Sequence, residues 1–190
     1  MKKYNKYIQL LVIAAFVGFV ACNDTNNYIN PKELIEAEQV LLEQYYSEMM
    51  DNDMTRLDSL SAEAVDTVDH RFESGLMLFH TKIGDGDSIK LFKRVGYRFN
   101  AYNIVQDSTE VTYESFAGTN EYATAPATYT TYILNDAGSA NSTGVPLGIN
   151  EAIQHMRLNG ECKVVLPSPI GGVNGYYTTI YEIKVTYLEQ

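Results

Sequence analysis

The side chains that could do chemistry in the C-terminal half are mainly aromatic and aliphatic. Such residues can line an apolar cleft, in which packing and one or two hydrogen-bond donors hold a ligand. A site of this kind needs neither a nucleophile nor a metal.

Other catalytic chemistry finds less support in the sequence. His70, His80 and His155 lie in separate predicted elements and lack metal-ligand spacing along the chain, which favours surface or core roles. Asp85 and Asp87 flank a glycine but lack the further ligands of a calcium loop. The chain has no G-x-S-x-G elbow and no P-loop. We therefore expect no metal and no cofactor.

The C-terminal stretch 144–190 must position several of the candidate side chains. Its first part is a turn followed by a short helix, in which Ile149, Ile153 and Met156 share one apolar face. A brief apolar strand follows and stops at a proline. The last part, 178–189, alternates apolar and polar residues and therefore predicts a half-buried strand.

Upstream segments with alternating or strand-forming residues predict the rest of a sheet. They cover residues 75–82, 95–103, 109–113 and 129–134. In the second of these segments, Phe99 and Tyr102 fall on opposite sides of the alternation. The small residues at 136–144 predict a loop.

In order and spacing, these elements resemble the domain of FKBP-type peptidyl-prolyl cis-trans isomerases. The resemblance covers residues 74–189, with one large insertion before Val145. It runs from a Ser-Gly-Leu strand and a Gly-x-Gly turn, through a hairpin, to the short helix, a strand, a proline-glycine loop and the terminal strand. It implies an α+β fold, in which a bent antiparallel sheet wraps around the short helix and an N-terminal helical extension precedes it. It also implies isomerase activity on X-Pro bonds.

The resemblance carries the family's pocket onto this chain position by position, with three departures. Ile149 stands where a Trp usually forms the pocket floor. Pro146 stands where a backbone N–H meets the bound peptide, and proline has no N–H. Gly172 stands near a loop Tyr whose hydroxyl helps to hold the ligand. The other carried-over positions are Tyr102, Tyr113, Val145 and Tyr181, together with Glu114 at an Asp position.

The N-terminal residues predict export and a lipid anchor. Three lysines precede the apolar run 7–21, which is typical of a secretory signal and too short for a comfortable membrane span. The run ends in Phe-Val-Ala before Cys22, which resembles a bacterial lipobox. We expect residues 1–21 to be a lipoprotein signal peptide and Cys22 to be lipidated. The protein is then anchored to a membrane of the cell envelope.

The rest of the chain divides into an extension, 22–74, and an FKBP-like domain, 75–190. In the extension, residues 31–50 form an amphipathic helix by their periodicity, and Asn30 serves as its cap. The apolar stripe of this helix must be buried, either on the domain or on a second copy of the chain in a homodimer. Residues 51–74 predict one short helix and a linker.

Charge and cysteine content limit the partners. The net charge is −10 and becomes −13 once the three lysines of the signal are removed. No cluster of Lys and Arg is present that could neutralise phosphates, so nucleic acid is not an expected partner. If Cys22 carries lipid, Cys162 has no cysteine partner and is expected to be a small buried apolar residue.

Three functions remain open from the sequence. The first is an isomerase that acts on X-Pro bonds of exported proteins. The second is an FKBP-like chaperone or interaction module with little catalysis, because of the three departures in the pocket. The third is an all-β surface lipoprotein that binds glycans through some of its 15 tyrosines.

Overall fold

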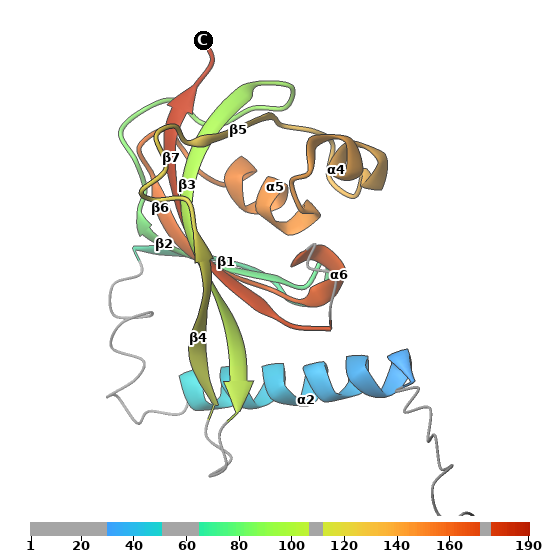
Figure 1. The fold of residues 1–190 in the computed structure, drawn as a ribbon. Helices are drawn as coiled ribbons and strands as arrows, with labels where there is room; N and C mark the ends of the chain where they lie inside the picture. Colours follow the sequence, from blue (N-terminus) through green and yellow to red (C-terminus); the bar gives the residue numbers. More distant parts are fainter. Residues whose placement is uncertain (1–29, 51–64, 107–111, 172–175) are drawn as a thin grey trace, which may run out of the picture. The chain divides into compact units, whose positions relative to one another are not determined.

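An antiparallel sheet of seven strands carries the fold (Figure 1). The computed structural model describes residues 30–50, 65–106, 112–171 and 176–190. The strands follow the order β1-β2-β6-β7-β3-β4, and β5 also pairs with β3. The strands are β1 Asp66–His70, β2 Leu76–Lys82, β3 Arg94–Gln106, β4 Thr112–Thr119, β5 Ala127–Thr130, β6 Glu161–Leu166 and β7 Thr179–Leu188. The helices are α2 Pro31–Met50, α4 Ala137–Thr143, α5 Leu147–Gln154 and α6 Ser168–Gly171.

Strand β3 connects the parts of the sheet. Its 13 residues pair with β7 along one edge, and with β5 and then β4 along the other. The register of the pairing with β7 shifts between Gly96 and Tyr97, and the register of the pairing with β4 shifts between Ala101 and Tyr102. Such bulges bend a strand and increase its local twist, so the sheet curves along β3.

The main core lies between one face of the sheet and α5, which Figure 1 shows against that face. The predicted alternation of the last strand is confirmed, because Tyr181, Ile183 and Val185 of β7 are buried on the α5 side. Helix α5 approaches closely at Gly148, where an added Cβ would lie 2.6 Å from a methyl of Leu166. The predicted α+β, FKBP-like fold, an antiparallel sheet with a short helix on one face, is confirmed.

The opposite face of the sheet is partly covered by α2. Tyr45 and Tyr46 of α2 are buried with Met77, Val165 and Ile180 of the sheet. The stripe predicted for residues 31–50 therefore packs on the same chain through the buried Tyr45 and Tyr46 and the half-buried Leu41 and Leu42, and a homodimer is not needed to cover this part of it. A homodimer through this helix stays a prediction.

Two segments differ from the structure that their composition predicted. Residues 66–70 form strand β1 instead of part of a linker, because their backbone pairs with β2 and Val68 packs against the core. Residues 137–143 form helix α4 instead of a loop. The Asp136 side chain caps its first turn, and Gly144 ends it in the left-handed conformation. In both cases the secondary structure depends on a specific contact, strand pairing for β1 and side-chain capping for α4, which the amino-acid composition of the segment does not indicate.

The described chain from Lys32 to Gln190 is one compact unit. It therefore includes α2 and β1 together with the predicted domain 75–190. Of the helices that the structure describes, none combines the length and the apolar character needed to cross a membrane. The predicted signal, residues 1–21, and the predicted lipidation site Cys22 lie outside the described residues.

Candidate functional site

Helix α5 and the sheet face beneath it enclose a chain of aromatic contacts. Phe99 lies edge-on to Tyr181 with 5.6 Å between ring centroids, and it stacks with Tyr97 at 6.0 Å. Tyr97 meets Tyr129 edge-on at 5.9 Å, and Tyr129 meets Tyr132 at 6.2 Å. Aromatic pairs at these distances and angles stabilise one another beyond their buried area. The result is a rigid, mostly apolar face.

The fully buried Asn150 of α5 fixes the rings at one end of this face. Its Oδ1 accepts hydrogen bonds from the Tyr132 N–H (3.2 Å) and the Tyr129 hydroxyl (3.3 Å), and its Nδ2 donates to the Tyr132 carbonyl (2.9 Å). The Tyr132 hydroxyl in turn donates to the Val145 carbonyl at 2.6 Å. The backbone N–H and carbonyl of Tyr132 hydrogen-bond the Asn150 side chain of α5 and are therefore not available to a neighbouring strand. Strand β5 accordingly ends at Thr130 and does not continue to residue 134 as predicted.

The tyrosines of the α5 face are neutral at physiological pH. Burial raises the pKa of Tyr97 and of Tyr132 to about 12, with smaller contributions from neighbouring charges. Burial also raises the pKa of Tyr129 and of Tyr181. Desolvation disfavours the phenolate, so these hydroxyls serve as hydrogen-bond donors and not as catalytic acids or bases. The face offers apolar binding with a few fixed donors.

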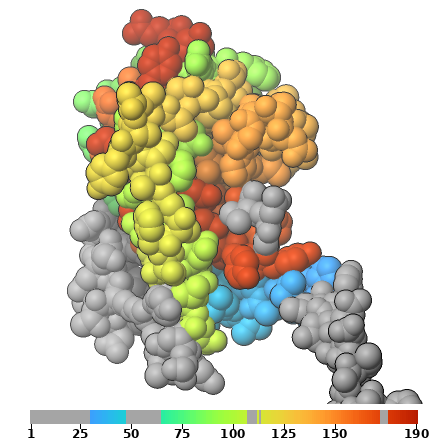
Figure 2. Space-filling view, in the orientation of Figure 1, coloured from blue at the N-terminus to red at the C-terminus, as the bar shows by residue number. Residues whose placement is uncertain are grey.

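The structure brings three of the six predicted site residues together. Val145, Ile149 and Tyr181 all belong to the core beneath α5, and they are 7 %, 3 % and 8 % exposed. Pro146, at the N-terminus of α5, has φ −55° and ψ 149°. In Figure 2 the segment with α5 (orange) and the segment with α6 (red-orange) lie on the same side of the molecule. Gly172 lies outside the described residues.

Tyr102 and Glu114 lie on the other face of the sheet, so the structure does not bring them to Tyr181. In the pairing of β3 with β7, Tyr181 is opposite Ala101 and Tyr102 is opposite Ile180. Side chains of directly paired residues share a face, and neighbours along a strand alternate. The position beside Tyr181 therefore belongs to Ala101, and Tyr102 packs with the cluster under α2.

Glu114 has a structural role on that second face. Its two carboxylate oxygens each lie 2.8 Å from Nζ of the buried Lys163, and the Tyr45 hydroxyl donates to Oε1 at 2.8 Å. These contacts connect β4, β6 and α2. The side chain of Tyr113, the sixth predicted residue, is not among those that the structure describes.

The six predicted site residues do not include four members of the aromatic face: Tyr97, Phe99, Tyr129 and Tyr132. The signal for the first two was present in the alternation of β3. Tyr102 alternates in phase with Arg98, whose charge predicts a solvent-facing side, whereas Phe99 falls on the other side. No local pattern marks Tyr129 and Tyr132, since their places depend on Asn150.

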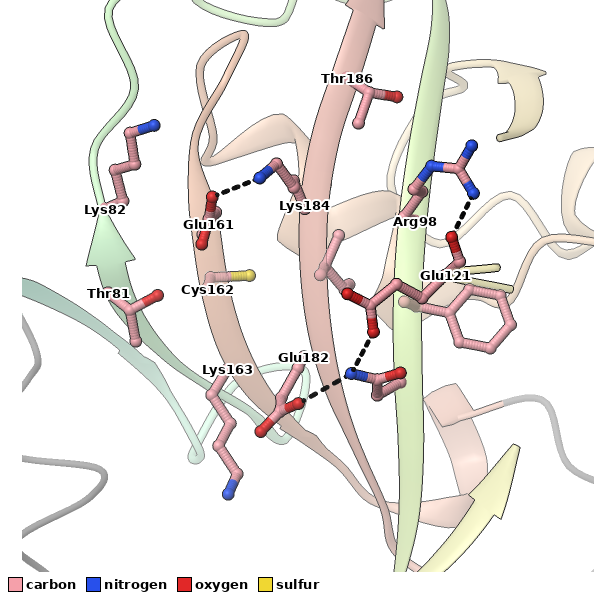
Figure 3. Close-up of a pocket in the computed structure, with 13 residues that line it drawn as sticks. Thr81, Lys82, Arg98, Glu121, Glu161, Cys162, Lys163, Glu182, Lys184 and Thr186 are labelled. Atoms are coloured by element: carbon pink, nitrogen blue, oxygen red, sulfur yellow. Dashed lines mark hydrogen bonds and ion pairs between the residues drawn. The ribbon is translucent and has the colours of Figure 1, made fainter. Parts of the chain in front are cut away.

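The outer face of β3, β6 and β7 carries an open groove of about 930 Å³ lined by charged residues (Figure 3). Glu161 and Lys184 pair across it at 2.9 Å, and Asn100 donates to Glu182 at 3.2 Å. The Arg98 guanidinium donates to three backbone carbonyls of the loop after β4. Much of the charge of the groove is thus compensated within the chain, as on a solvated sheet face.

One group of described residues places three potential metal-ligand atoms close together. The ligand atoms of His70, Glu151 and His155 all lie within 4.8 Å of one another. The two histidines lie far apart along the chain and in different elements, but the fold brings the end of β1 next to the end of α5.

The architecture is the α+β, FKBP-like fold that the sequence predicted. Its short helix lies across one face of an antiparallel sheet, and its terminal strand lies inside that sheet. The chain is similar to a peptidyl-prolyl cis-trans isomerase from Pseudomonas syringae pv. tomato, with a TM-score of 0.48, 14 % identity, and coverage of 87 % of this chain and 100 % of that chain. It is also similar to FkpA from Escherichia coli, with a TM-score of 0.47, 13 % identity, and coverage of 95 % and 82 %.

A third similar structure is the N-terminal domain of FKBP42 from Arabidopsis thaliana, with a TM-score of 0.44, 9 % identity, and coverage of 66 % of this chain and 93 % of that chain. No family model matches the chain, and no curated protein matches it. At these identities the likeness concerns the fold alone. The roles of residues must therefore come from the geometry of this chain.

Proposed function

We propose that this chain is a divergent FKBP-type peptidyl-prolyl isomerase-like protein that binds X-Pro segments of exported proteins at its α5 face. The observation that carries the proposal is the half-buried ring of Phe99, which a peptide can reach. This ring contacts the buried Tyr181 and Tyr97 over an α5 floor that includes Ile149. This face is aromatic and contains no ionised group among the residues that form these contacts.

The chemistry of prolyl isomerisation fits such a face. X-Pro bonds populate both isomers, and the isomers exchange over tens to hundreds of seconds. A site that binds the twisted amide more tightly than the planar forms lowers the barrier. Since the twisted carbonyl is less polar, it loses less on leaving water for an aromatic surface. No proton is transferred, so the neutral tyrosines suffice.

We propose that catalysis is weak in comparison with binding. Pro146 has no N–H to offer at the start of α5. Ala101, and not a tyrosine, lies opposite Tyr181. Ile149 is 3 % exposed and mainly fills the core. These three features favour the alternative in which the chain acts as a chaperone-like binding module with the same fold.

The location that we propose is the cell envelope. The support is the apolar run 7–21 with its lysines and the lipobox-like end at Cys22. The lipid would hold the folded unit near the membrane, and X-Pro segments of exported proteins would be its partners.

The glycan-binding alternative has less support. Among the described tyrosines, those that are at most 8 % exposed are Tyr45, Tyr46, Tyr97, Tyr129, Tyr132 and Tyr181. The exposed ones lie on separate segments, with Tyr122 before β5, Tyr187 near the end of β7, and Tyr176 and Tyr177 before β7. Sugar stacking needs accessible rings grouped on one surface.

The test compares substitutions of Tyr181 and Tyr102, which lie on opposite faces of the sheet. Exchange between cis and trans forms of a short Xaa-Pro peptide is measured by NMR exchange spectroscopy with the full chain in detergent micelles. Tyr181→Leu removes an aromatic ring from the α5 face, and Tyr102→Leu is the matched control on the α2 face. Loss of roughly 1 kcal/mol of aromatic contact corresponds to about a fivefold weaker binding of peptide by Tyr181→Leu. We expect the control to bind and accelerate exchange as the parent does.

The possible outcomes distinguish an isomerase from a chaperone-like binding module. Accelerated exchange that Tyr181→Leu reduces and Tyr102→Leu preserves supports an isomerase. Peptide binding without acceleration, with the same pattern of variants, supports the chaperone-like module. If the parent neither binds the peptide nor accelerates its exchange at high protein concentration, the proposal is wrong. Far-UV circular dichroism checks that both variants are folded.

A further inference from the structure

We propose that His70, Glu151 and His155 form a binding site for a divalent transition-metal ion, and that zinc is the ion that suits it best. The site lies where the end of β1 meets the end of α5. The site shares no residue with the aromatic contacts of Phe99 and Tyr181. The proposal of a metal site is therefore independent of the proposed function.

The geometry already gathers three ligand atoms. The His70 Nδ1 and the Glu151 Oε1 are 2.9 Å apart, and the rings of His70 and His155 meet edge-on with 5.1 Å between centroids. All three ligand atoms lie within 4.8 Å of one another. Around a tetrahedral zinc with bonds of about 2.0–2.2 Å, ligand atoms are separated by about 3.3–3.6 Å. Small side-chain rotations are therefore enough to reach the bound arrangement.

Local structure explains why these residues converge. Glu151 lies in α5, and His155 is the residue that caps its C-terminus, with helical backbone angles. Residues four apart on a helix share a face. His70 is the last residue of β1 and pairs with Leu76 of β2, a residue of the core face. The three residues therefore meet on the side of the sheet that α5 covers.

Charge and burial favour a cation at this point. The Glu151 side chain is only 7 % exposed, and its single ion-pair partner among the described residues is His70. The hydroxyl of Ser74 donates to the same carboxylate oxygen, Oε1, at 2.8 Å. A hydrogen bond of this kind orients a metal-binding carboxylate from outside. A divalent ion would place two positive charges beside the buried carboxylate.

The ligand types and their exposure point to a particular class of ion. Two imidazoles and one carboxylate suit zinc and related transition ions, whereas magnesium and calcium prefer oxygen ligands alone. His155 is exposed and the His70 side chain is 28 % exposed, so an ion has access from solvent. A water molecule would complete the four ligands of zinc. The bound ion would connect β1, at the edge of the sheet, to α5.

The test measures zinc affinity directly. The full chain in detergent micelles competes for Zn²⁺ with a chromophoric chelator, and Co²⁺ is used in parallel because a tetrahedral site gives it characteristic visible absorption. We expect one equivalent of Zn²⁺ to bind, and Mg²⁺ not to compete. His155→Ala should lower the zinc affinity at least about tenfold. Replacing a residue that only hydrogen-bonds to a metal ligand already lowers metal affinity about 10–100-fold, and His155 is proposed as a ligand itself. His70→Gln is the second ligand variant.

The controls keep the result specific to the cluster. Glu121→Gln removes an exposed carboxylate from the outer groove and should leave zinc affinity unchanged. Zinc should raise the unfolding temperature of the parent but not that of His155→Ala, since a ligand that binds only the folded state stabilises it. If the parent and both ligand variants bind zinc equally, or if the parent binds none below millimolar concentration, the site is refuted. Peptide binding by the parent is unaffected in either case.

Discussion

At the scale of single residues, Asn150 shows how one buried polar side chain positions a functional face. It is fully buried, and each of its side-chain groups is paired with the 129–132 segment. A buried polar group is tolerated when its hydrogen bonds are made, and each group left without a partner costs about 1–3 kcal/mol. The same side chain ends β5 and holds the aromatic rings against α5.

We therefore expect Asn150→Ala to lower the free energy of unfolding by about 2–4 kcal/mol. The substitution leaves the N–H of Tyr132 without its partner and creates a small cavity under α5. The measurement is urea unfolding followed by circular dichroism. Asn141→Ala on exposed α4 is the matched control and should change stability by less than about 0.5 kcal/mol. Equal effects of the two substitutions would contradict the role given to Asn150.

At the scale of elements, Glu38 connects α2 to the segment around α6. Its carboxylate accepts hydrogen bonds from the N–H of Ser168 (2.8 Å), from the Ser168 hydroxyl (2.5 Å) and from the Thr178 hydroxyl (2.9 Å). Glu38 is 6 % exposed, although it lies on a helix with many solvated glutamates. The contact adds a polar anchor to the apolar packing of Tyr45 and Tyr46 against the sheet.

We expect Glu38→Ala to loosen the docking of α2 and to lower the free energy of unfolding by about 2–3 kcal/mol, because hydrogen bonds to a charged group are lost together. Hydrogen exchange should accelerate at the amides of α2 and of α6. Glu43→Ala, at an exposed position of the same helix, is the control and should leave exchange unchanged. Unaltered exchange in Glu38→Ala would show that apolar packing alone holds α2.

At the scale of the whole molecule, the sheet separates two cores with different partners. The α5 side holds the aromatic face and the histidines, and the α2 side holds a smaller core with the Lys163–Glu114 ion pair. His80 belongs to the α5 side. It is 4 % exposed, and its Nδ1 has no hydrogen-bond partner among the described residues.

This position makes the stability of the fold depend on pH. Burial lowers the pKa of His80, the nearby Asp66 opposes this shift, and the charge of His155 adds to it. The unfolded histidine has a pKa of about 6.5. As the pH falls from 6.5 through the lowered folded pKa, the unfolded state binds more protons, so stability decreases. Above pH 6.5 this contribution is fully present.

We expect His80→Leu to be less sensitive to acid than the parent between pH 7.5 and pH 5. Urea unfolding in the presence of a chelator gives the free energy at each pH, and the chelator removes any effect of bound metal. The sign of the difference is the prediction, because the substitution removes a group whose charged form is disfavoured by burial in the folded state. Identical pH profiles for parent and variant would show that His80 does not govern the acid limb.

The amino-acid sequence by itself determined the local elements of the core: the helix around Ile149, the strand around Tyr181 and the phase of each alternation. These follow from periods of 3.6 and 2, which are properties of neighbouring residues. Only the tertiary structure decided which strands pair and in which register, and therefore that Tyr102 lies across the sheet from Tyr181 and that His70 reaches His155. Pairing joins residues far apart in the chain, and a shift of one residue moves a side chain to the other face, so no local pattern specifies it.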